Sequence, residues 1–444
     1  MVIIVDTLRA DHVYGDRART PNMDALARDG LRFTRMFPEA MPTVPARNSI
    51  LSGRRVFPFR GWHDYRGLIA EPGWSPLRDV NTSFTTVLRK AGYWTAYATD
   101  NPFLGFAPPY KRFRRSFNRF ARNGGQVGGK GRGVSKRELR HWLHPAMEDS
   151  ATRERMRRYL ANGNRYYRDE SRSFAARVFK AGVRLLDDAK RNRPFCLVLD
   201  TFEPHEPWTP PRKYIDLYGD PDYRGPEPSK PYYAAVSQYL DPGNRDRLLR
   251  RMRALYAAEV TMTDRWLGVF MDRLHDMRLD RNTAVVLCSD HGFLFGERGY
   301  TGKKPHELHP ALTRVPLTIV HPDRRRAGRT IEGFASTHDV APTVLSMAGV
   351  RAPTRMNGRD LSRAFRGRLP DRDYVFGGYS NNFYIRSDRW LLIGNNRPGA
   401  FKLYDLKADP AESRNVAGSN PGKVRELYGI VRKRAGGRLP YYDY

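Results

Sequence analysis

Short apolar runs of strand length alternate along this chain with longer stretches of helical periodicity. This alternation indicates an α/β fold, in which helices cover a largely parallel sheet. The runs that we interpret as strands are residues 2–5, 93–98, 195–199, 284–288 and 316–320. The stretches that we interpret as helices are residues 22–29, 47–52, 83–91, 154–190, 248–275 and 338–348. We therefore expect a large, mostly parallel sheet sandwiched between helices.

The pattern changes after Pro353. Residues 372–395 and 401–405 have the character of short antiparallel strands, and a terminal helix is predicted near 421–435. A chain of 444 residues exceeds the length at which a single core stops growing, so a large and a small unit are expected. We predict a catalytic domain over 1–365 and a small C-terminal antiparallel-sheet subdomain over 366–444.

The chain is strongly basic, with 78 Lys and Arg against 47 Asp and Glu and a formal charge of +31. Such a charge attracts anionic partners, but here the excess is mostly arginine and is scattered, which favours a compositional origin. Residues 111–140 are the exception, because basic residues alternate there with phenylalanines before a glycine-rich run. Two explanations stay open for this segment: a polyanion-binding surface, or a lid over an active site.

The sequence also bears on location. It contains no apolar run of about 18 residues, so no transmembrane segment is expected. Met1 leads directly into the first strand without a visible signal peptide, and we expect a cytoplasmic protein whose N-terminus is incomplete in this sequence. Cys196 and Cys288 lie in apolar runs and are interpreted as small buried hydrophobic residues. The oligomeric state stays open.

Residues 42–55 contain the pattern Thr43-x-Pro45-x-Arg47, followed by small polar residues typical of a helix start. A hydroxyl one helical turn from an arginine, at a helix N-terminus, is a suitable place for an oxyanion. Backbone N–H groups and the helix dipole favour the anion there, and Arg47 can hold it with two parallel hydrogen bonds. The competing interpretation is a proline turn with a helix cap.

Acidic residues follow several of the predicted strands. Asp6 ends the first run, Asp100 and Asp200 follow the second and third, and Asp290 with His291 follows the fourth. Catalytic groups gather at the carboxyl ends of parallel strands. We therefore expect these side chains to lie at one edge of the sheet.

Taken together, these motifs resemble the sulfatase family of the alkaline-phosphatase superfamily, and the resemblance extends over nearly the whole chain. It rests on the acid at Asp6, the segment 20–27, the motif at Thr43 and the Ser-Asp-His-Gly run at 289–292. The resemblance implies that Thr43 occupies the nucleophile position. It also implies that Asp6, Asp290 and His291 hold a divalent metal, with Ca²⁺, Mg²⁺, Mn²⁺ and Zn²⁺ all compatible.

The resemblance extends to further residues. His205 lies in a Pro-His-x-Pro segment, where the family implies contact with the leaving group, and a near-neutral pKa would suit a general acid. Lys303 matches the lysine of a Gly-x-x-Gly-Lys segment and would neutralise charge on the transferred group. Second-tier candidates are Thr7, Lys304, His309, His338, Asp100 and Asn101.

Three departures from the family pattern matter. Family members oxidise Cys or Ser to formylglycine, but threonine is a secondary alcohol and yields only a ketone, so formylglycine is not expected. Thr7 stands where a second Asp is common. Residues 99–103 replace a Gly-Lys-Trp-His segment, which removes a lysine and a histidine. We interpret these changes as favouring a phosphodiester or a phosphonate ester over a sulfate ester.

The sequence therefore predicts a metal-dependent hydrolase of sulfate- or phosphate-type esters with Thr43 as nucleophile. Its partner is an anionic ester substrate. Two alternatives stay open. One is a phosphoryl- or sulfuryl-group transferase of the same fold, in which an alcohol instead of water clears the covalent intermediate. The other is a catalytically inactive polyanion-binding protein.

Overall fold

A sheet of nine strands, counted among the described residues, runs through the molecule in the order β11-β2-β10-β7-β1-β6-β4-β5, with β12 beside β2. The structure is a computed structural model and describes residues 1–444 except 128–132, 164, 369–371 and 398. The strands are β1 (Val2–Val5), β2 (Leu31–Phe37), β4 (Trp94–Thr99), β5 (Arg119–Arg122), β6 (Phe195–Thr201), β7 (Val285–Ser289), β10 (Val315–Val320), β11 (Arg329–Ile331) and β12 (Ala335–Ser336). All pairs are parallel except the two that β10 makes with β2 and β7.

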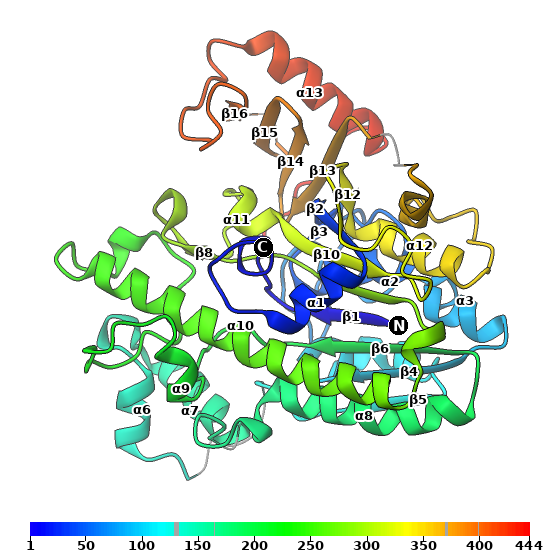
Figure 1. The fold of residues 1–444 in the computed structure, drawn as a ribbon. Helices are drawn as coiled ribbons and strands as arrows, with labels where there is room; N and C mark the ends of the chain where they lie inside the picture. Colours follow the sequence, from blue (N-terminus) through cyan, green and yellow to red (C-terminus); the bar gives the residue numbers. More distant parts are fainter. Residues whose placement is uncertain (128–132, 164, 369–371, 398) are drawn as a thin grey trace.

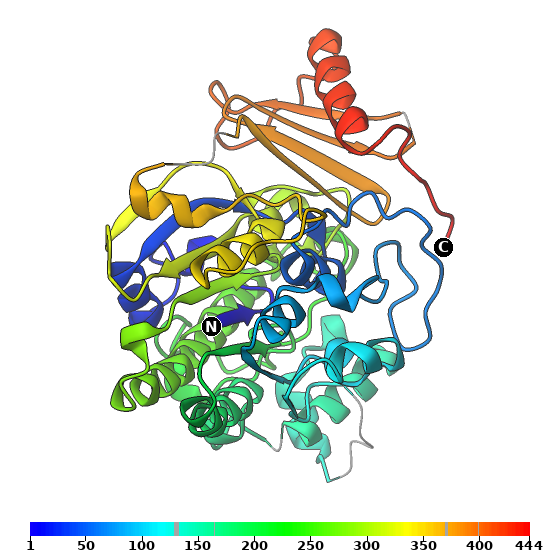
Figure 2. The ribbon, with the colours of Figure 1, turned by 90° about the vertical axis from the view of Figure 1, so that its right-hand side faces the viewer.

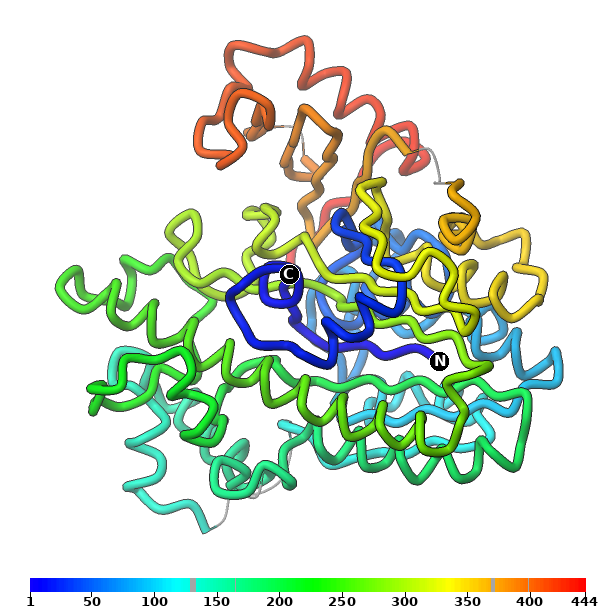
Figure 3. The backbone as a smooth tube through the Cα atoms, viewed as in Figure 1, coloured from blue at the N-terminus to red at the C-terminus, as the bar shows by residue number. Residues whose placement is uncertain are grey.

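Helices cover both faces of this sheet because its central strands are apolar on both sides. Ile3 and Val5 of β1 face one core, which contains α1 (Pro21–Asp29), α8 (Phe174–Arg191) and α10 (Arg245–Asp276). Val2 and Ile4 face the opposite core, which contains α2 (Thr43–Ser52), α3 (Phe84–Lys90) and α12 (Val340–Met347). Figure 1 shows α8 and α10 side by side in the lower part of the molecule, and the trace in Figure 3 shows β1 crossing its middle.

A second sheet is built almost entirely from the C-terminal region. Its order is β16-β15-β14-β13-β3, from β16 (Lys402–Asp405), β15 (Trp390–Asn395), β14 (Asn382–Ser387), β13 (Tyr374–Tyr379) and β3 (Ala40–Met41). Helix α13 (Pro421–Arg434) packs on it, and Figure 2 shows this unit stacked above the larger one. The strand β3 comes instead from the N-terminal part of the chain, just before α2, and it pairs in parallel with β13.

Shorter elements complete the chain and connect the layers. They are α4 (Pro102–Phe106), α5 (Lys111–Arg114), α6 (Lys136–Trp142), α7 (Ser150–Asn162), α9 (Arg212–Ile215) and α11 (Pro310–Thr313), with the hairpin of β8 (Leu294–Phe295) and β9 (Thr301–Gly302). No described helix combines the length and apolar character that crossing a membrane requires.

The predicted α/β architecture with a small antiparallel sheet is confirmed, but two helix predictions were wrong in extent. The single helix expected over 154–190 is two helices, because α7 ends at Asn162 and Ser173 begins α8 by accepting the Ala176 N–H at 3.1 Å. The helix expected at 47–52 starts earlier, at Thr43, since Pro45 lies in the first turn, where a missing N–H costs nothing. The boundary at 365/366 stays a prediction.

The basic segment 111–140 is partly described, and residues 128–132 lie outside the description. Its phenylalanines are not surface groups. Phe113 and Phe117 are buried against Tyr97 of β4, and β5 adds the segment to the edge of the large sheet. The alternation of Phe and Arg is therefore explained by packing of the aromatic side chains beneath an arginine-rich surface.

Candidate active site

Thr43 is the first residue of α2, and its side chain is buried at the end of the sheet. At this position the helix presents unpaired backbone N–H groups and the positive end of its dipole. Among the described residues no hydrogen bond reaches the Thr43 hydroxyl; its backbone carbonyl accepts one from Arg47 Nη1 at 3.3 Å. The hydroxyl therefore keeps its donor and acceptor capacity for another group.

Arg47 lies one turn further along α2 and is completely buried among three carboxylates. Its Nη1 lies 3.0 Å from Asp6 Oδ2 and 2.6 Å from Asp290 Oδ2. Its Nε and Nη2 donate to Asp200, at 3.0 Å to Oδ2 and 2.7 Å to Oδ1. The guanidinium group thus joins the ends of three strands, and both of its donor edges are occupied by protein carboxylates.

The strand register explains why Asp200 reaches Arg47. Asp200 pairs with Ile4 in register, so its side chain lies on the face of the sheet that α2 covers. Tyr97 of β4 points to the same face and donates from Oη to Asp200 Oδ2 at 2.7 Å. The sequence indicates Asp200 only as an acid at a strand end, and no motif in it points to Tyr97.

Asp6, Asp290 and His291 come together as a group with ligand geometry. One ligand atom from each lies within 4.8 Å of the others. His291 Nδ1 donates to the Gly292 carbonyl at 2.9 Å, which leaves the Nε2 lone pair facing the two acids, 3.4 Å from Asp290 Oδ2. That Nε2 is buried and has no hydrogen-bond partner among the described residues. Two carboxylates and one neutral imidazole, held by a backbone carbonyl behind it, fit a divalent metal.

The charges at this centre also favour a cation. Burial and the neighbouring Asp290 charge raise the pKa of Asp6 well above its ordinary value, as expected for acids that share one buried site. Burial lowers the pKa of His291 to about 4, against the opposing charge of Asp290, so the imidazole is neutral near pH 7. Three carboxylates, Asp6, Asp200 and Asp290, face the single guanidinium of Arg47, and a divalent ion would offset the difference.

Thr7 links the two acids through its backbone and side chain. Its Oγ1 donates to Asp6 Oδ1 at 2.6 Å, and its backbone N–H donates to Asp290 Oδ1 at 2.9 Å. This geometry requires a φ of +59°, which is unusual for a β-branched residue and is found mainly where the surroundings enforce it. Thr7 therefore orients Asp6 and Asp290, although it adds no charge to the site.

Lys303 and His205 form a second cluster. Lys303 Nζ donates to His205 Nε2 at 2.7 Å, so the imidazole carries its proton on Nδ1, which donates to the Glu206 carbonyl at 2.7 Å. Burial lowers the pKa of His205 to about 3; Glu206 opposes this change, whereas Lys303 adds to it. In this arrangement the ammonium group of Lys303, and not the imidazole, carries the transferable proton.

Glu206 contacts the cationic side chains around this cluster. It is buried, and its Oε1 accepts a hydrogen bond from Lys230 Nζ at 2.8 Å and another from the Tyr233 hydroxyl. Its Oε2 lies 4.0 Å from Lys303 Nζ. Sequence analysis did not assign roles to Glu206, Lys230 or Tyr233. The only signal was that Glu206 lies inside the Pro-His-x-Pro segment.

The second-tier histidines lie in structural positions. His309 Nδ1 contacts Glu412 Oε2 at 2.7 Å, so it connects the large unit to the C-terminal one. His338 Nδ1 contacts Ser336 Oγ at 3.1 Å, and burial lowers its pKa to about 3. Neither belongs to the cluster of possible metal ligands found among the described residues.

The other second-tier residues also have local partners. Asp100 Oδ1 accepts the Phe202 N–H at 2.8 Å, and burial raises the pKa of Asp100 to about 8. Asn101 begins α4 by accepting the Phe103 N–H at 2.9 Å. Lys304 Nζ donates to the Tyr233 carbonyl at 3.2 Å, adjacent to the Lys303 cluster.

Known proteins match this chain over most of its length. The family model described as Sulfatase matches residues 1–350, and the one described as N-sulphoglucosamine sulphohydrolase, C-terminal, matches residues 296–428. A choline-sulfatase from Rhizobium meliloti (strain 1021) is 24% identical over 469 residues, covering 96% of this chain and 83% of that protein. An arylsulfatase from Clostridium perfringens is 27% identical over 269 residues, and this chain spans about half of its length, with 56% of this chain and 55% of that protein covered.

Solved structures agree with these sequence matches. The phosphonate monoester hydrolase SpPMH from Silicibacter pomeroyi has a TM-score of 0.74 to this chain at 22% identity, covering 100% of this chain and 96% of that one. At 22% identity, this structural similarity establishes the fold of the chain. The Sulfatase family model matches most of the chain, and the motifs found in the sequence meet at one edge of the sheet. This protein therefore belongs to the sulfatase family of ester hydrolases.

Proposed function

We propose that this chain is a metal-dependent hydrolase of sulfate- or phosphate-type esters and that Thr43 is its nucleophile. The observation that carries the proposal is the position of the Thr43 hydroxyl. It lies at the N-terminus of α2 with no hydrogen bond to any residue that the structure describes, and Arg47 on the same helix is bonded to Asp6 and Asp290 of the ligand group. An anion at this helix end would be attracted by the dipole.

Asp6, Asp290 and His291 would hold the divalent metal in this proposal. A bound metal would supply positive charge that lowers the pKa of a nearby hydroxyl and polarises the ester. Arg47 would keep Asp6 and Asp290 at fixed positions through its two contacts from Nη1. The role that we expected for Arg47 from the sequence, a fork open to the substrate, is replaced in this proposal by a role in orienting carboxylates.

The placement of the side chains indicates which bonds would form and which would break. Thr43 Oγ1 would form a bond to the phosphorus or sulfur atom as its proton leaves to solvent. The bond to the leaving oxygen would break, and that oxygen would take a proton from Lys303 Nζ. His205, neutral and bonded to Lys303, would orient the ammonium group. Water would then cleave the Thr43 ester and restore the hydroxyl.

For the substrate class we propose a phosphodiester or phosphonate ester in preference to a sulfate ester. All three carry a single negative charge, which suits a site where the Lys303 ammonium lies 4.0 Å from the Glu206 carboxylate and keeps positive charge for a substrate. The preference among them rests on the nucleophile, because a threonine alkoxide replaces the formylglycine hydrate of sulfatases. The names of the relatives support both classes, since they include a choline-sulfatase and a phosphonate monoester hydrolase.

A comparison of rates on matched nitrophenyl esters tests the proposal. The panel contains a phosphodiester, a phosphonate ester, a phosphate monoester and a sulfate ester, each measured with Mg²⁺, Ca²⁺, Mn²⁺ and Zn²⁺. Intact mass spectrometry after rapid quenching should show the chain with the phosphoryl-ester or phosphonyl group that remains after the nitrophenol leaves, and peptide mapping should locate this group at Thr43. A wide preference for the sulfate ester would contradict the substrate assignment, and products formed on added alcohols would favour the transferase alternative.

The alternative of an inactive polyanion-binding protein is less well supported. The side chains proposed for the site are all present: Asp6, Arg47, Asp290, His291 and Lys303. Asp6 and Asp290 are buried close together, and such a pair of carboxylates is energetically costly unless it binds a cation. Complete absence of turnover on the whole panel, with metal bound at full stoichiometry, would favour that alternative.

A further inference from the structure

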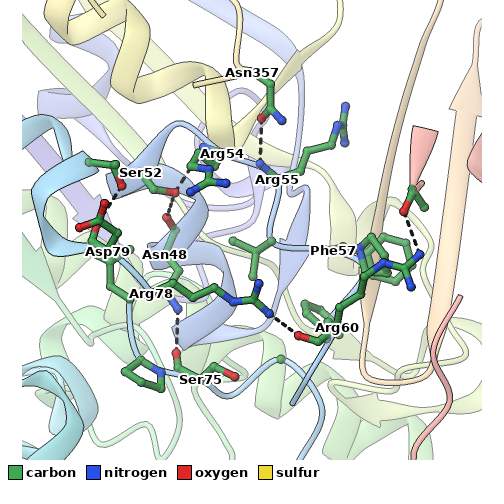
Figure 4. A pocket seen from close by; sticks show the side chains of 18 of the residues that line it. Asn48, Ser52, Arg54, Arg55, Phe57, Arg60, Ser75, Arg78, Asp79 and Asn357 are labelled. Carbon is green, nitrogen blue, oxygen red and sulfur yellow. Dashed lines mark hydrogen bonds between the residues drawn. The ribbon is translucent and has the colours of Figure 1, made fainter. Parts of the chain in front are cut away.

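A pocket lies toward the opposite end of α2 from Thr43. Asn48 and Ser52 of α2 form one wall, and the segments 54–60 and 73–79 form others (Figure 4). The end of α13 also lines it, through Arg434 and Ala435. Its volume of about 300 Å³ is at the small end of the range for organic ligands.

The charge of this pocket is strongly one-sided. Five arginines and a single acid, Asp79, are among its lining residues; the arginines are Arg54, Arg55, Arg60, Arg78 and Arg434. None of the five forms an ion pair with a carboxylate in the part of the chain that the structure describes. The Asp79 carboxylate instead accepts the Asn81 N–H at 3.0 Å. A scattered excess of arginine explains unpaired guanidinium groups on the surface, but not the presence of five arginines around one cavity.

Several of these side chains are fixed in place by neutral partners. Arg60 Nη2 donates to the carbonyls of Ala435 at 3.1 Å and Arg438 at 2.8 Å. Arg78 reaches across the pocket to the Arg60 carbonyl, as Figure 4 shows, and Arg434 Nε donates to Tyr374 Oη at 2.9 Å. Carbonyls and a phenol orient a guanidinium group without neutralising it. The positive charge therefore remains available to a ligand.

Two arginines differ in how they face the pocket. The Arg55 guanidinium lies 3.9 Å from the centroid of the Phe376 ring, which directs it toward the C-terminal sheet. The Arg54 side chain is half-buried and makes no hydrogen bond within the described residues. A partly desolvated guanidinium without an acceptor is unfavourable, so Arg54 has the most to gain from a bound anion.

We propose that this pocket binds a phosphate or sulfate group carried on a small organic body such as a sugar. Arg54 and Arg78 would hold the oxyanion, since guanidinium forks match tetrahedral oxyanions with paired hydrogen bonds. Phe57 and Phe59, which lie edge to face at 5.5 Å, supply an apolar wall for the body of the ligand. Ser52, at the far end of the pocket wall, lies nine residue steps from the proposed nucleophile Thr43, which is about 14 Å of helix.

Calorimetric titration of the metal-loaded Thr43→Val protein tests the proposal without turnover. The ligands are glucose 6-phosphate, glucose 6-sulfate, inorganic phosphate and inorganic sulfate. We expect the double variant R54Q/R78Q, in the same background, to bind the sugar esters at least tenfold more weakly. The control is R112Q/R115Q, which removes two exposed arginines outside the pocket and should leave the affinity unchanged.

The outcomes are distinct from those that test the proposed function. R54Q/R78Q with an intact Thr43 should hydrolyse a small nitrophenyl ester at the wild-type rate, because neither arginine contacts the catalytic cluster. Equal affinity in R54Q/R78Q and the control would overturn the site. Inorganic ions that bind as tightly as the sugar esters would show that the organic body is not recognised. If the double variant unfolds, the single change Arg54→Gln, with an expected loss of threefold or more, decides the question.

Discussion

Arg47 donates to Asp200 through two nitrogens in a pair that is fully buried: Nε contacts both carboxylate oxygens, at 3.1 Å to Oδ1 and 3.0 Å to Oδ2, and Nη2 contacts Oδ1 at 2.7 Å. This pairing leaves Nη1 of Arg47 for Asp6 and Asp290. Because the arginine cannot rotate without losing the bidentate contact, Asp200 fixes the guanidinium beside the proposed metal ligands. A residue 153 positions away in the sequence thereby sets the position of Arg47.

We expect Asp200 and Tyr97 to act on catalysis through Arg47. Asp200→Asn should lower kcat by about 10²-fold and lower the free energy of unfolding by roughly 3–5 kcal/mol, because it breaks a buried charge pair. Tyr97→Phe is the milder change, with about 1 kcal/mol lost and a lowered kcat at unchanged KM. Tyr110→Phe is the matched control, since Tyr110 is buried on the same face but donates to Asn48. Equal kcat in both tyrosine variants would mean that Asp200 only stabilises the fold.

Removal of a proposed metal ligand should remove the metal. Asp290→Asn eliminates one of the two carboxylates that face His291 Nε2, so bound metal, measured by elemental analysis, should fall below a tenth of an equivalent together with turnover. Asp264→Asn is the control, because Asp264 is equally buried but accepts the Met23 N–H in the first turn of α1. Full metal content in Asp290→Asn would rule out the assignment of this ligand group.

The hydroxyl of Thr43 should be required, whereas its methyl group should not. Thr43→Ser should keep substantial activity, and the nearly isosteric Thr43→Val should lose kcat by roughly 10³-fold or more, as expected when a nucleophile is removed. Ser49→Ala on the same helix removes a hydroxyl that contacts Thr337 and should leave kcat unaffected. Wild-type turnover by Thr43→Val would show that water attacks the ester directly.

His338 should affect stability in acid and not catalysis. Burial lowers its pKa to about 3 from an ordinary value of 6.5, so the unfolded chain binds a proton in this window that the folded chain does not. Its contribution to stability is complete above pH 6.5 and decreases as the pH falls toward 3, by about 1.4 kcal/mol for each pH unit. Denaturant unfolding of His338→Asn should show a smaller decrease in the free energy of unfolding between pH 6.5 and pH 3 than the wild type shows. Its kcat/KM should stay within twofold of wild type. An unchanged pH dependence of stability would contradict this role.

The large-scale fold was accessible from the sequence because buried parallel strands are continuous apolar runs. All five predicted strands lie within one or two residues of those observed. The strand β2 was missed because Leu31–Phe37 is not a continuous apolar run: Arg32, Thr34 and Arg35 interrupt it, and two polar residues in succession at 34–35 break the alternation that would mark a half-buried strand. The break between α7 and α8 depends on Glu203, which accepts the N–H groups of Phe174 and Ala175 from a distant loop.

The positions of the acids could be predicted, but their partners could not. Strand ends indicated Asp6, Asp200 and Asp290, because the edge of a parallel sheet collects such residues. That Arg47 would bind all three depends on the register of β1, β6 and β7 and on where α2 begins, which are tertiary properties. The same holds for Glu206, whose contacts with Lys230 and Tyr233 join residues more than twenty positions apart.

The pairing of β3 with β13 has a consequence for how this protein can be divided. Ala40 and Met41 are hydrogen-bonded in register with Gly378 and Tyr379, and the chain enters α2 at Thr43 two residues later. A shortened chain that stops before β13 would expose the backbone of the segment that leads into Thr43, even though every proposed ligand and proton donor were still present. The C-terminal unit therefore supports the segment that carries the proposed nucleophile, and we expect its exchange between relatives to change the alignment of Thr43.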